Sequence, residues 1–291
     1  MSQHANRPQA VPSSAYSAST VVRFAGPDYR DFVASAGERL RPRLAHALDL
    51  AALYSGCRVL DLGCGRGETA VHAALRDARV VALDYSADCL DLTREAASLV
   101  RGPTAEGEGE LDVQLAMADA TALPFADGAF DRVLMLDVVE HLYQWQLEAT
   151  MREVCRVLAP DGFAVIHTLP NRWALNIGYP LLRVLRPSLP RDPRTDYEHD
   201  VHVNEQDIVG LSRTLHDAGL HARVWLENLT IEQARWQPKS DAFPDVRGPA
   251  YRLLRKKPVR ALAQMALRTP LRLIACNDIF AIARPATASQ G

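Results

Sequence analysis

The sequence has few cysteines, little net charge and no long hydrophobic run, and each shortage excludes a class of protein. Its five cysteines are scattered, odd in number and without a C-x-x-C pair, which is poor material for a disulfide framework or a zinc site. A net charge of −2 argues against nucleic-acid binding through bulk positive charge. No run approaches a membrane span, and the first residues hold no apolar core of signal-peptide length. We therefore expect a reduced, cytoplasmic protein without a nucleic-acid partner.

What the sequence does contain is an alternation of strand-like and helix-like segments. Its 291 residues, 48% of them hydrophobic, suffice for one large domain or for one domain with a lid-like insertion. Apolar runs at RVLDL, RVVAL, DVQLA, DRVLML and FAVIHTL alternate with helical segments at 68–76, 87–100 and 142–158. This alternation predicts an α/β fold, with a doubly wound, mostly parallel sheet and helices on both faces.

The segments outside this alternation predict a leader, a lid and a basic insertion. Residues 1–20 lack periodicity, so we expect a frayed or substrate-capping leader. After residue 169 a Pro- and Arg-rich connection interrupts the rhythm, and a connection of that length usually covers a site. Asn204 followed by Asp207 suggests a helix N-cap, and Gly219 suggests the end of that helix. The expected divisions are a leader at 1–37, a core at 38–169, a lid at 170–203, the rest of the core at 204–285 with a basic insertion at about 230–275, and a tail at 286–291.

The strongest local signal is VLDLGCGRGETA at residues 59–70. A strand ends, three glycines (Gly63, Gly65 and Gly67) form a turn, and a helix follows at once. Glycine lets main-chain amides approach a ligand closely. A dinucleotide site needs G-x-G-x-x-G, but the third glycine position is Glu68, whose carboxylate would repel a pyrophosphate. The motif therefore favours S-adenosylmethionine, which has no phosphate, over the cofactor of an NAD-dependent oxidoreductase.

Three acidic residues lie at the ends of three successive predicted strands. Asp61 precedes the glycines, Asp84 ends VVALD, and Asp119 follows DVQLA. The carboxyl ends of parallel strands meet at one edge of a sheet, where such folds bind ligands. Asp84 is placed to accept hydrogen bonds from both ribose hydroxyls, and Asp119 to accept one from the adenine amino group. Solvation explains a single strand-end aspartate, but it does not explain three at one edge.

Residues 57–168 resemble the class I S-adenosylmethionine-dependent methyltransferases, especially the small-molecule branch typified by quinone-pathway enzymes. The matching pieces, in order, are VLDLGCGRG, ALDYS, ADATALPFADGAFDRV, LDVVEHL and VCRVLAPDGFAVI. NDIFAIAR is similar to the last strand of that family. The resemblance implies a seven-stranded Rossmann-like sheet whose last strand is antiparallel, and a methyl transfer to oxygen or nitrogen of a small-molecule acceptor, either a metabolite or a lipid-linked compound. A donor-binding protein that has lost turnover stays an alternative, since a fold alone does not prove activity.

The resemblance also implies roles for individual residues. Gly63 and Gly65 would lie against the donor, Asp119 with Ala120 would contact adenine, and Leu136 with Asp137 would pass beside the methionine portion. The complete predicted cofactor-binding set is Asp61, Gly63, Cys64, Gly65, Asp84, Tyr85, Asp119, Ala120, Leu136 and Asp137.

His141, in VVEHL after the fourth strand, is the candidate general base. A histidine can take a proton from a hydroxyl or an amine at neutral pH. Alternatively, His141 only caps the following helix or shapes the pocket floor, and we expect Glu140 to be structural. His199 and His202, near Asp200, could ligate a metal, but no third group of ligands supports them, so we predict no metal.

Two features bear on the acceptor and on partners. The stretch from Arg247 to Arg272 holds eight basic residues and no acidic one, so it could contact an anionic membrane or an acidic acceptor. A solvated helix face is favoured, because Pro258 and Pro270 interrupt the helix. The aromatic residues Trp173, Tyr179, Tyr197 and Trp236 could line an acceptor pocket or serve only as packing. Whether the protein is a monomer or a homodimer stays open.

Overall fold

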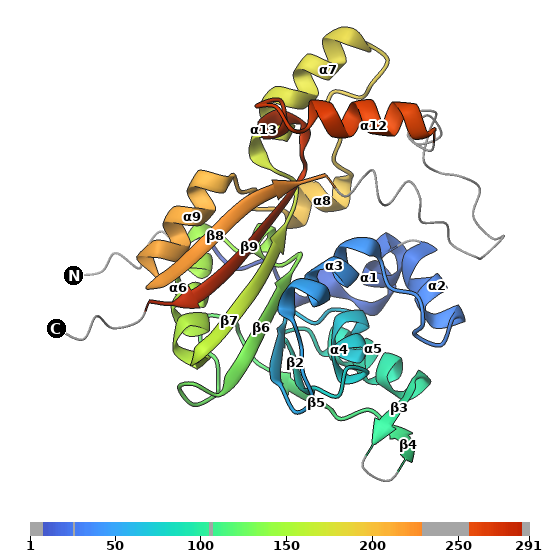
Figure 1. Cartoon of the computed structure of the whole chain (residues 1–291), viewed down its shortest axis with the longest axis vertical. Coiled ribbons are helices and arrows are strands. Elements are labelled where there is room, and N and C mark those ends of the chain that lie inside the picture. Colours follow the sequence, from blue (N-terminus) through green and yellow to red (C-terminus); the bar gives the residue numbers. More distant parts are fainter. Residues whose placement is uncertain (1–7, 26, 105–106, 229–255, 287–291) are drawn as a thin grey trace.

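A seven-stranded sheet with the order β5-β2-β1-β6-β7-β9-β8 forms the centre of the computed structural model (Figure 1). The structure describes residues 8–25, 27–104, 107–228 and 256–286. Every neighbouring pair is parallel except those of β9, which runs antiparallel to both β7 and β8. The predicted sheet with an antiparallel last strand is therefore confirmed. Its strands are β1 (Arg58–Leu62), β2 (Arg79–Asp84), β5 (Val113–Met117), β6 (Phe130–Leu136), β7 (Leu158–Thr168), β8 (Leu220–Glu227) and β9 (Asp278–Pro285).

The strand order reverses beside β1, and this reversal places the ligand site. From β1 the chain moves outward through β2 to β5, and then returns to pair β6 on the other side of β1. The crossovers on the two sides of such a switch point leave in opposite directions, so a crevice opens at the carboxyl ends of the central strands.

Helices cover both faces of the sheet. On one face α3 and α4 pack on the central strands, and on the other α6 and α9 pack on β7, β8 and β9. Leu48 of α3 and Met151 of α6 are at most 1% exposed, and burying such a side chain stabilises the fold by about 1.5–3 kcal/mol. The helices are α1 (Ala18–Ala25), α2 (Pro27–Ala34), α3 (Pro42–Ala51), α4 (Glu68–Ala74), α5 (Ala87–Leu99), α6 (Gln144–Val157), α7 (Tyr179–Leu185), α8 (Asp196–Val201), α9 (Ile208–Asp217), α12 (Lys257–Ala266) and α13 (Arg272–Ala275). Shorter turns are η1 (Ser13–Tyr16), η2 (Val139–His141) and the π-helical η3 (Ala174–Gly178).

The leader packs onto the domain from residue 8 onward. Val21 of α1 is buried against Cys89 and Leu92 of α5. The carbonyl oxygen of Tyr16 accepts a hydrogen bond of 3.1 Å from the Ser86 hydroxyl. The described part of the leader is therefore packed and not frayed, because these contacts hold it although its sequence lacks periodicity; that it caps a substrate stays a prediction. Residues 1–7 and most of the expected tail, 287–291, lie outside the described residues.

Three local expectations were wrong. A hairpin of β3 (Arg101–Thr104) and β4 (Gly107–Glu110) follows α5, where no strand was predicted. Asp207, rather than Asn204, caps α9, since its carboxylate accepts hydrogen bonds from the amides of Val209 and Gly210. Pro258 lies in the first turn of α12 and does not interrupt it, because proline there loses no intrahelical hydrogen bond.

Candidate active site

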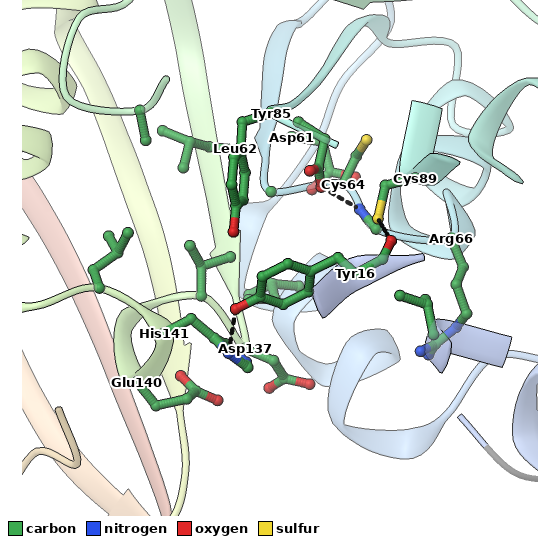
Figure 2. A pocket seen from close by; sticks show the side chains of 18 of the residues that line it. Tyr16, Asp61, Leu62, Cys64, Arg66, Tyr85, Cys89, Asp137, Glu140 and His141 are labelled. Atoms are coloured by element: carbon green, nitrogen blue, oxygen red, sulfur yellow. Dashed lines mark hydrogen bonds between the residues drawn. The ribbon is translucent and has the colours of Figure 1, made fainter. Parts of the chain in front are cut away.

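A pocket of about 430 Å³ opens at the carboxyl ends of the central parallel strands. Helical segments from the leader and from α8 also contribute to its walls. Figure 2 shows many of its side chains converging on one space. All predicted site residues line this one pocket: Asp61, Gly63, Cys64, Gly65, Asp84, Tyr85, Asp119, Ala120, Leu136, Asp137 and His141. Their individual roles stay predictions.

The glycines after β1 serve different purposes. Gly65 has a φ of +55°, and a Cβ atom placed on it would meet nothing within 4 Å, so its main chain borders open space. Gly67 has a φ of +81°, and its Cβ would lie 2.8 Å from the Cα of Thr93 in α5. Gly65 therefore leaves room for a ligand, whereas Gly67 allows α4 and α5 to pack closely.

Asp61 presents an unsatisfied carboxylate oxygen. Its Oδ2 atom is buried and makes no hydrogen bond within the described part of the chain. Burial, together with the charge of Asp84, raises the pKa of Asp61 to about 7. A cationic ligand group would satisfy this oxygen and favour its ionised form. The amino group of S-adenosylmethionine has the required charge, so the residue present fits the expected donor.

Asp84 is fixed at the end of β2 by main-chain amides. Its Oδ1 accepts from the Ser86 amide at 2.9 Å, and its Oδ2 accepts from the Gly65 amide at 3.1 Å. Burial raises the pKa of Asp84, while these hydrogen bonds oppose the rise. Each oxygen keeps a further lone pair, which is what acceptance from two ribose hydroxyls requires. Asp119 is exposed at the neighbouring strand end, where its Oδ1 accepts from the amide and hydroxyl of Thr121.

The floor of the pocket contains a chain of alternating charges. Asp137, with a left-handed φ of +58°, is bound by Arg43 and by Nδ1 of His167, the latter at 2.5 Å. Nε2 of His167 lies 3.2 Å from Asp278 at the start of β9. Burial alone would lower the pKa of His167, but Asp137 and Asp278 outweigh it and raise the pKa to about 9. Arg43 and His167 hold the pKa of Asp137 well below its ordinary value. The carboxylate of Asp137 is thus already neutralised by protein cations.

Tyr16 of the leader reaches across the pocket to His141. The Tyr16 hydroxyl lies 3.0 Å from Nδ1 of His141, as Figure 2 shows. When the ring of His141 carries its proton on Nε2, Nδ1 accepts the Tyr16 proton. Desolvation, with the nearby ring of His202, lowers the pKa of His141 to about 3. His141 is therefore neutral at neutral pH and holds a hydrogen bond from a leader tyrosine.

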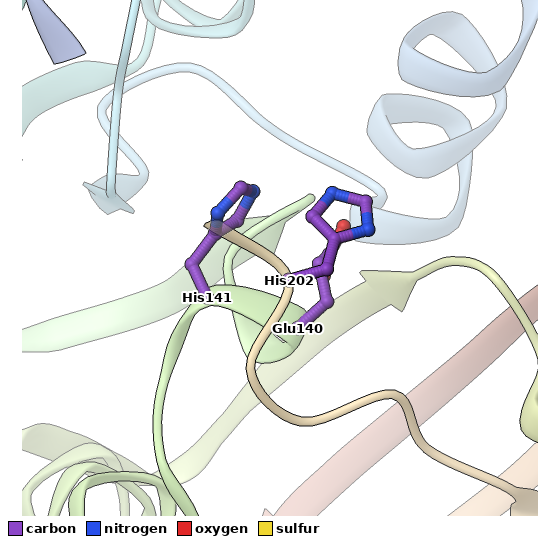
Figure 3. A group of neighbouring side chains, drawn as sticks. All are labelled: Glu140, His141 and His202. Atoms are coloured by element: carbon purple, nitrogen blue, oxygen red, sulfur yellow. The ribbon is translucent and has the colours of Figure 1, made fainter. Parts of the chain in front are cut away.

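Glu140, His141 and His202 are the one group of possible metal ligands found in the described residues (Figure 3). Their ligand atoms all lie within 4.8 Å of one another. Nδ1 of His141 already makes a hydrogen bond with Tyr16, and Oε2 of Glu140 accepts one of 2.7 Å from Thr168, whereas Nδ1 of His202 is buried without a hydrogen-bond partner in the described residues. Burial, with the charge of Asp137, raises the pKa of Glu140 to about 8, so its carboxyl is mainly protonated at neutral pH. A metal bound through Nδ1 of His141 and Oε2 of Glu140 would have to replace these two hydrogen bonds.

His199 does not join this group. It is exposed, and its Nε2 lies 2.8 Å from Asp192, while His202 faces the pocket. Among the aromatic candidates for an acceptor pocket, Tyr197 lines the site, Trp173 and Tyr179 are not among its lining residues, and Trp236 lies outside the described residues.

Sequence reasoning missed Tyr16, Arg43 and His167. Tyr16 lies in a segment without periodicity, and Arg43 reads as an ordinary charge on an amphipathic helix. His167 had a detectable signal, because it is a lone ionisable residue in the apolar strand FAVIHTL. A buried histidine in such a strand needs polar partners.

Comparison with known proteins agrees with this geometry. A family model described as a methyltransferase domain matches residues 59–162. Methyltransferase GfsG of Streptomyces halstedii is 34% identical over 151 residues, which are 52% of this chain and 50% of GfsG. A demethylmenaquinone methyltransferase of Mycobacterium sp. (strain KMS) is 30% identical over 187 residues, which are 60% of this chain and 72% of the relative. The chain spans about half the length of the first curated relatives it matches.

A solved structure shares the fold at low sequence identity. Phosphoethanolamine N-methyltransferase 2 of Haemonchus contortus, solved with S-adenosyl-L-methionine, superposes with a TM-score of 0.59 at 16% identity. The alignment covers 94% of this chain and 58% of that one. This likeness shows the common fold.

Proposed function

The chain belongs to the class I S-adenosylmethionine-dependent methyltransferases, and from this premise we propose that it methylates an oxygen or nitrogen atom of a small-molecule acceptor. One observation carries the proposal. A single pocket combines Asp61 and Asp84, which suit the donor, with the Tyr16–His141 pair, which suits an acceptor proton.

The donor side is a set of fixed acceptors. When bound, S-adenosylmethionine supplies a methyl group on a sulfonium, which leaves as a neutral thioether. Asp84, held by the amides of Gly65 and Ser86, would accept from the ribose hydroxyls, and Asp61 would pair with the amino group. Cys64 and Tyr85, with Leu136 and Asp137, would complete the wall on this side, and Asp119 with Ala120 would contact the adenine. Alignment of the reactants and exclusion of water can account for much of the rate in such a displacement.

On the acceptor side, one proton passes from the acceptor through Tyr16 to His141. The acceptor O–H donates to the hydroxyl oxygen of Tyr16 while the Tyr16 proton passes to Nδ1 of His141. Burial raises the pKa of Tyr16, so this hydroxyl relays a proton and does not hold a negative charge. His141 is a weak base, but a hydroxyl oxygen becomes a strong acid once it carries a methyl group, and its proton then passes readily.

This weakness of His141 favours oxygen over nitrogen as the acceptor atom. A methylated amine is too weak an acid to protonate a histidine whose pKa is about 3. A neutral amine would react without the relay, which would leave the Tyr16–His141 pair without a catalytic role. O-methylation is therefore the reaction that uses the pair.

The surrounding segments complete the proposal. The lid at 170–203 and the described part of the leader at 1–37 shield the pocket from water, because Tyr197, Glu198 and His202 of the lid and Tyr16 of the leader line it. The core at 38–169 and 204–285 carries the sheet. The protein acts in the cytoplasm on a small molecule, with no nucleic-acid partner and no metal.

Transfer of labelled methyl from S-adenosylmethionine tests the proposal. Extract of the source cells is incubated with wild-type protein or with Asp84→Ala, and the label is then partitioned between water and organic solvent. We expect label in a small molecule with wild type alone, and mass spectrometry should place the methyl on oxygen.

Other outcomes identify the alternatives. Binding of S-adenosylhomocysteine without any transfer would indicate a donor-binding regulatory protein. Binding of NAD in place of S-adenosylhomocysteine would indicate an oxidoreductase and would contradict the donor assignment.

A further inference from the structure

Large apolar side chains are exposed in two short segments of the fold. Fourteen large hydrophobic residues are exposed in the described chain, and eight of them fall within residues 177–185 and 262–271. Leu185 is 84% exposed, Val184 77% and Leu262 66%. The eight residues are Ile177, Leu181, Leu182, Val184, Leu185, Leu262, Met265 and Leu271. Contiguous exposed apolar surface is uncommon on soluble proteins and marks a site of interaction.

The two segments share one anchored base. The side-chain amide of Asn171 is buried and donates hydrogen bonds of 2.9 Å to the carbonyls of Leu273 and Cys276. A Cβ on Gly178 would lie 1.8 Å from the carbonyl oxygen of Ile274, so η3 and α13 touch main chain to main chain. α7 continues directly from η3, and α12 leads into α13. Figure 1 shows α7, α12 and α13 at the end of the molecule where β8 ends and β9 begins. We call residues 177–191 and 256–272 the amphipathic cap.

The charge of the amphipathic cap has one sign. It carries eight basic residues and no acidic residue, whereas the rest of the sequence has 25 basic and 35 acidic residues. The basic residues are Arg183, Arg186, Arg191, Lys256, Lys257, Arg260, Arg268 and Arg272. A net positive charge is therefore concentrated where the apolar side chains are exposed, on a protein that is otherwise acidic.

We propose that the amphipathic cap binds an anionic lipid surface. Helices with exposed leucine and methionine side chains and basic flanks lie in the plane of the headgroups, with apolar residues inserted and cations on the lipid phosphates. No helix in the described residues is long and apolar enough to span a membrane, so the contact is interfacial. A second copy of the chain is a poorer occupant, because a symmetric contact would bring two sets of positive charges together.

The amphipathic cap lies on the same connection as the lid of the pocket. From α7 the chain continues through residues 186–195 to α8, where Tyr197 and Glu198 line the pocket. A lipid surface held by α7 would therefore lie near the segment through which an acceptor enters. This consequence rests on the proposed function, whereas the lipid binding does not.

Vesicle sedimentation of the full chain tests the proposal without any assay of activity. The vesicles are phosphatidylcholine alone, or phosphatidylcholine mixed with phosphatidylglycerol. Wild type should bind the anionic vesicles alone, and binding should weaken as salt is added. Val184→Ser/Leu185→Ser should lower the partition coefficient by roughly tenfold or more, since both side chains lose apolar burial. Arg183→Gln/Arg186→Gln/Lys257→Gln/Arg260→Gln should lower it by about two orders of magnitude.

Matched controls make the same kinds of substitution at exposed residues elsewhere. Leu99→Ser/Val209→Ser and Arg79→Gln/Arg94→Gln/Arg152→Gln/Arg213→Gln should bind as wild type does. Circular dichroism and thermal melting of each variant verify that it folds.

Three results would overturn the proposal. The first is no binding of wild type to the anionic vesicles, and the second is equal loss in the cap and control variants. The third is a dimer in light scattering that Val184→Ser/Leu185→Ser dissociates, with no vesicle binding, which would make a second copy the occupant. None of these outcomes bears on methyl transfer, so the two proposals fail separately.

Discussion

The hydroxyl of Tyr16 and Nδ1 of His141 lie 3.0 Å apart, although 125 residues separate them in the sequence. The ring of Tyr16 also packs edge-on against Tyr85, with centroids 5.7 Å apart, and Tyr85 donates a hydrogen bond to the carbonyl of Val11. The leader is thus tied to both the proposed donor side and the proposed acceptor side of the pocket.

Tyr16→Phe should slow methyl transfer and leave donor binding intact. It removes the hydroxyl that relays the acceptor proton, so we expect kcat to fall by roughly a hundredfold, within the range of general acid–base catalysis. The dissociation constant of S-adenosylhomocysteine, measured by calorimetry, should stay at the wild-type value. His141→Ala should have a similar effect, and the double variant should be no slower than either single one. Tyr54→Phe, on a half-exposed surface tyrosine, serves as the control. Near-normal turnover of His141→Ala at saturating acceptor would contradict the relay.

Asp84→Ala should weaken donor binding. The carboxylate is expected to accept two hydrogen bonds from ribose, and a hydrogen bond to a charged group contributes about 1.5–3 kcal/mol. Calorimetry with S-adenosylhomocysteine should therefore show an affinity lower by roughly tenfold to a hundredfold. Asp91→Ala, on the exposed side of α5, should bind normally. Wild-type affinity in Asp84→Ala would remove this residue from the donor site.

Donor affinity should rise as the pH rises towards 7. In the free pocket burial raises the pKa of Asp61 to about 7, and the ammonium of the donor needs the ionised carboxylate. Below that pKa, binding must release a proton from Asp61. The affinity should therefore rise by up to about tenfold per pH unit below pH 7 and level off above pH 7. Asp61→Asn should bind weakly and without this slope. Glu140→Gln should keep the slope, and loss of the slope there would assign the proton to Glu140.

His167→Gln should destabilise the protein most in mildly acidic solution. The pKa of His167 rises from its ordinary value of 6.5 to about 9, so its stabilising contribution is complete below pH 6.5 and is lost as the pH rises through 9. The difference corresponds to about 3 kcal/mol. Urea unfolding should show this loss at pH 6 and a smaller one at higher pH. His221→Gln, on an exposed position of β8, should change little at any pH. A loss that is independent of pH would show that His167 acts by packing alone.

Removal of divalent metals should not affect activity. A metal held by Nδ1 of His141 and Oε2 of Glu140 would have to displace the hydrogen bonds with Tyr16 and Thr168. Protein dialysed against a chelator should therefore turn over at the rate of untreated protein. A stoichiometric bound ion in equilibrium dialysis, together with loss of activity on its removal, would contradict this prediction.

The donor half of the pocket was predictable because its signals are local. Asp61, Asp84 and Asp119 each lie at a strand end, and parallel strands bring such ends to one edge without further information. The alternation of apolar runs with helical segments is also a local signal, and it predicted the strands of the parallel sheet.

The acceptor half was less predictable because it depends on contacts distant in sequence. Tyr16 reaches His141 from a leader without periodicity, and Arg43 meets Asp137 from a helix 94 residues away. The amphipathic cap was partly visible as a basic stretch, but Pro258 was misread as a helix breaker. The exposed apolar residues of α7 join the same surface only because η3 packs on α13, and this contact is not visible in the sequence.

The position of β9 has a consequence for the order of folding. Within the described residues β8 pairs only with β9. β9 also pairs with β7 across 119 residues (Ala164 with Ala283), the greatest separation of any strand pair in the sheet, so we expect this edge to assemble last. The pairs β1–β2, β2–β5 and β6–β7 can form earlier, because only 21 to 33 residues separate their paired positions. Yet β9 also delivers Asp278 to His167, which in turn holds Asp137 in the pocket. An incompletely folded chain would therefore present the expected donor-binding edge before the acidic floor of the pocket is fixed. The complete pocket would form only after β9 has paired with the sheet.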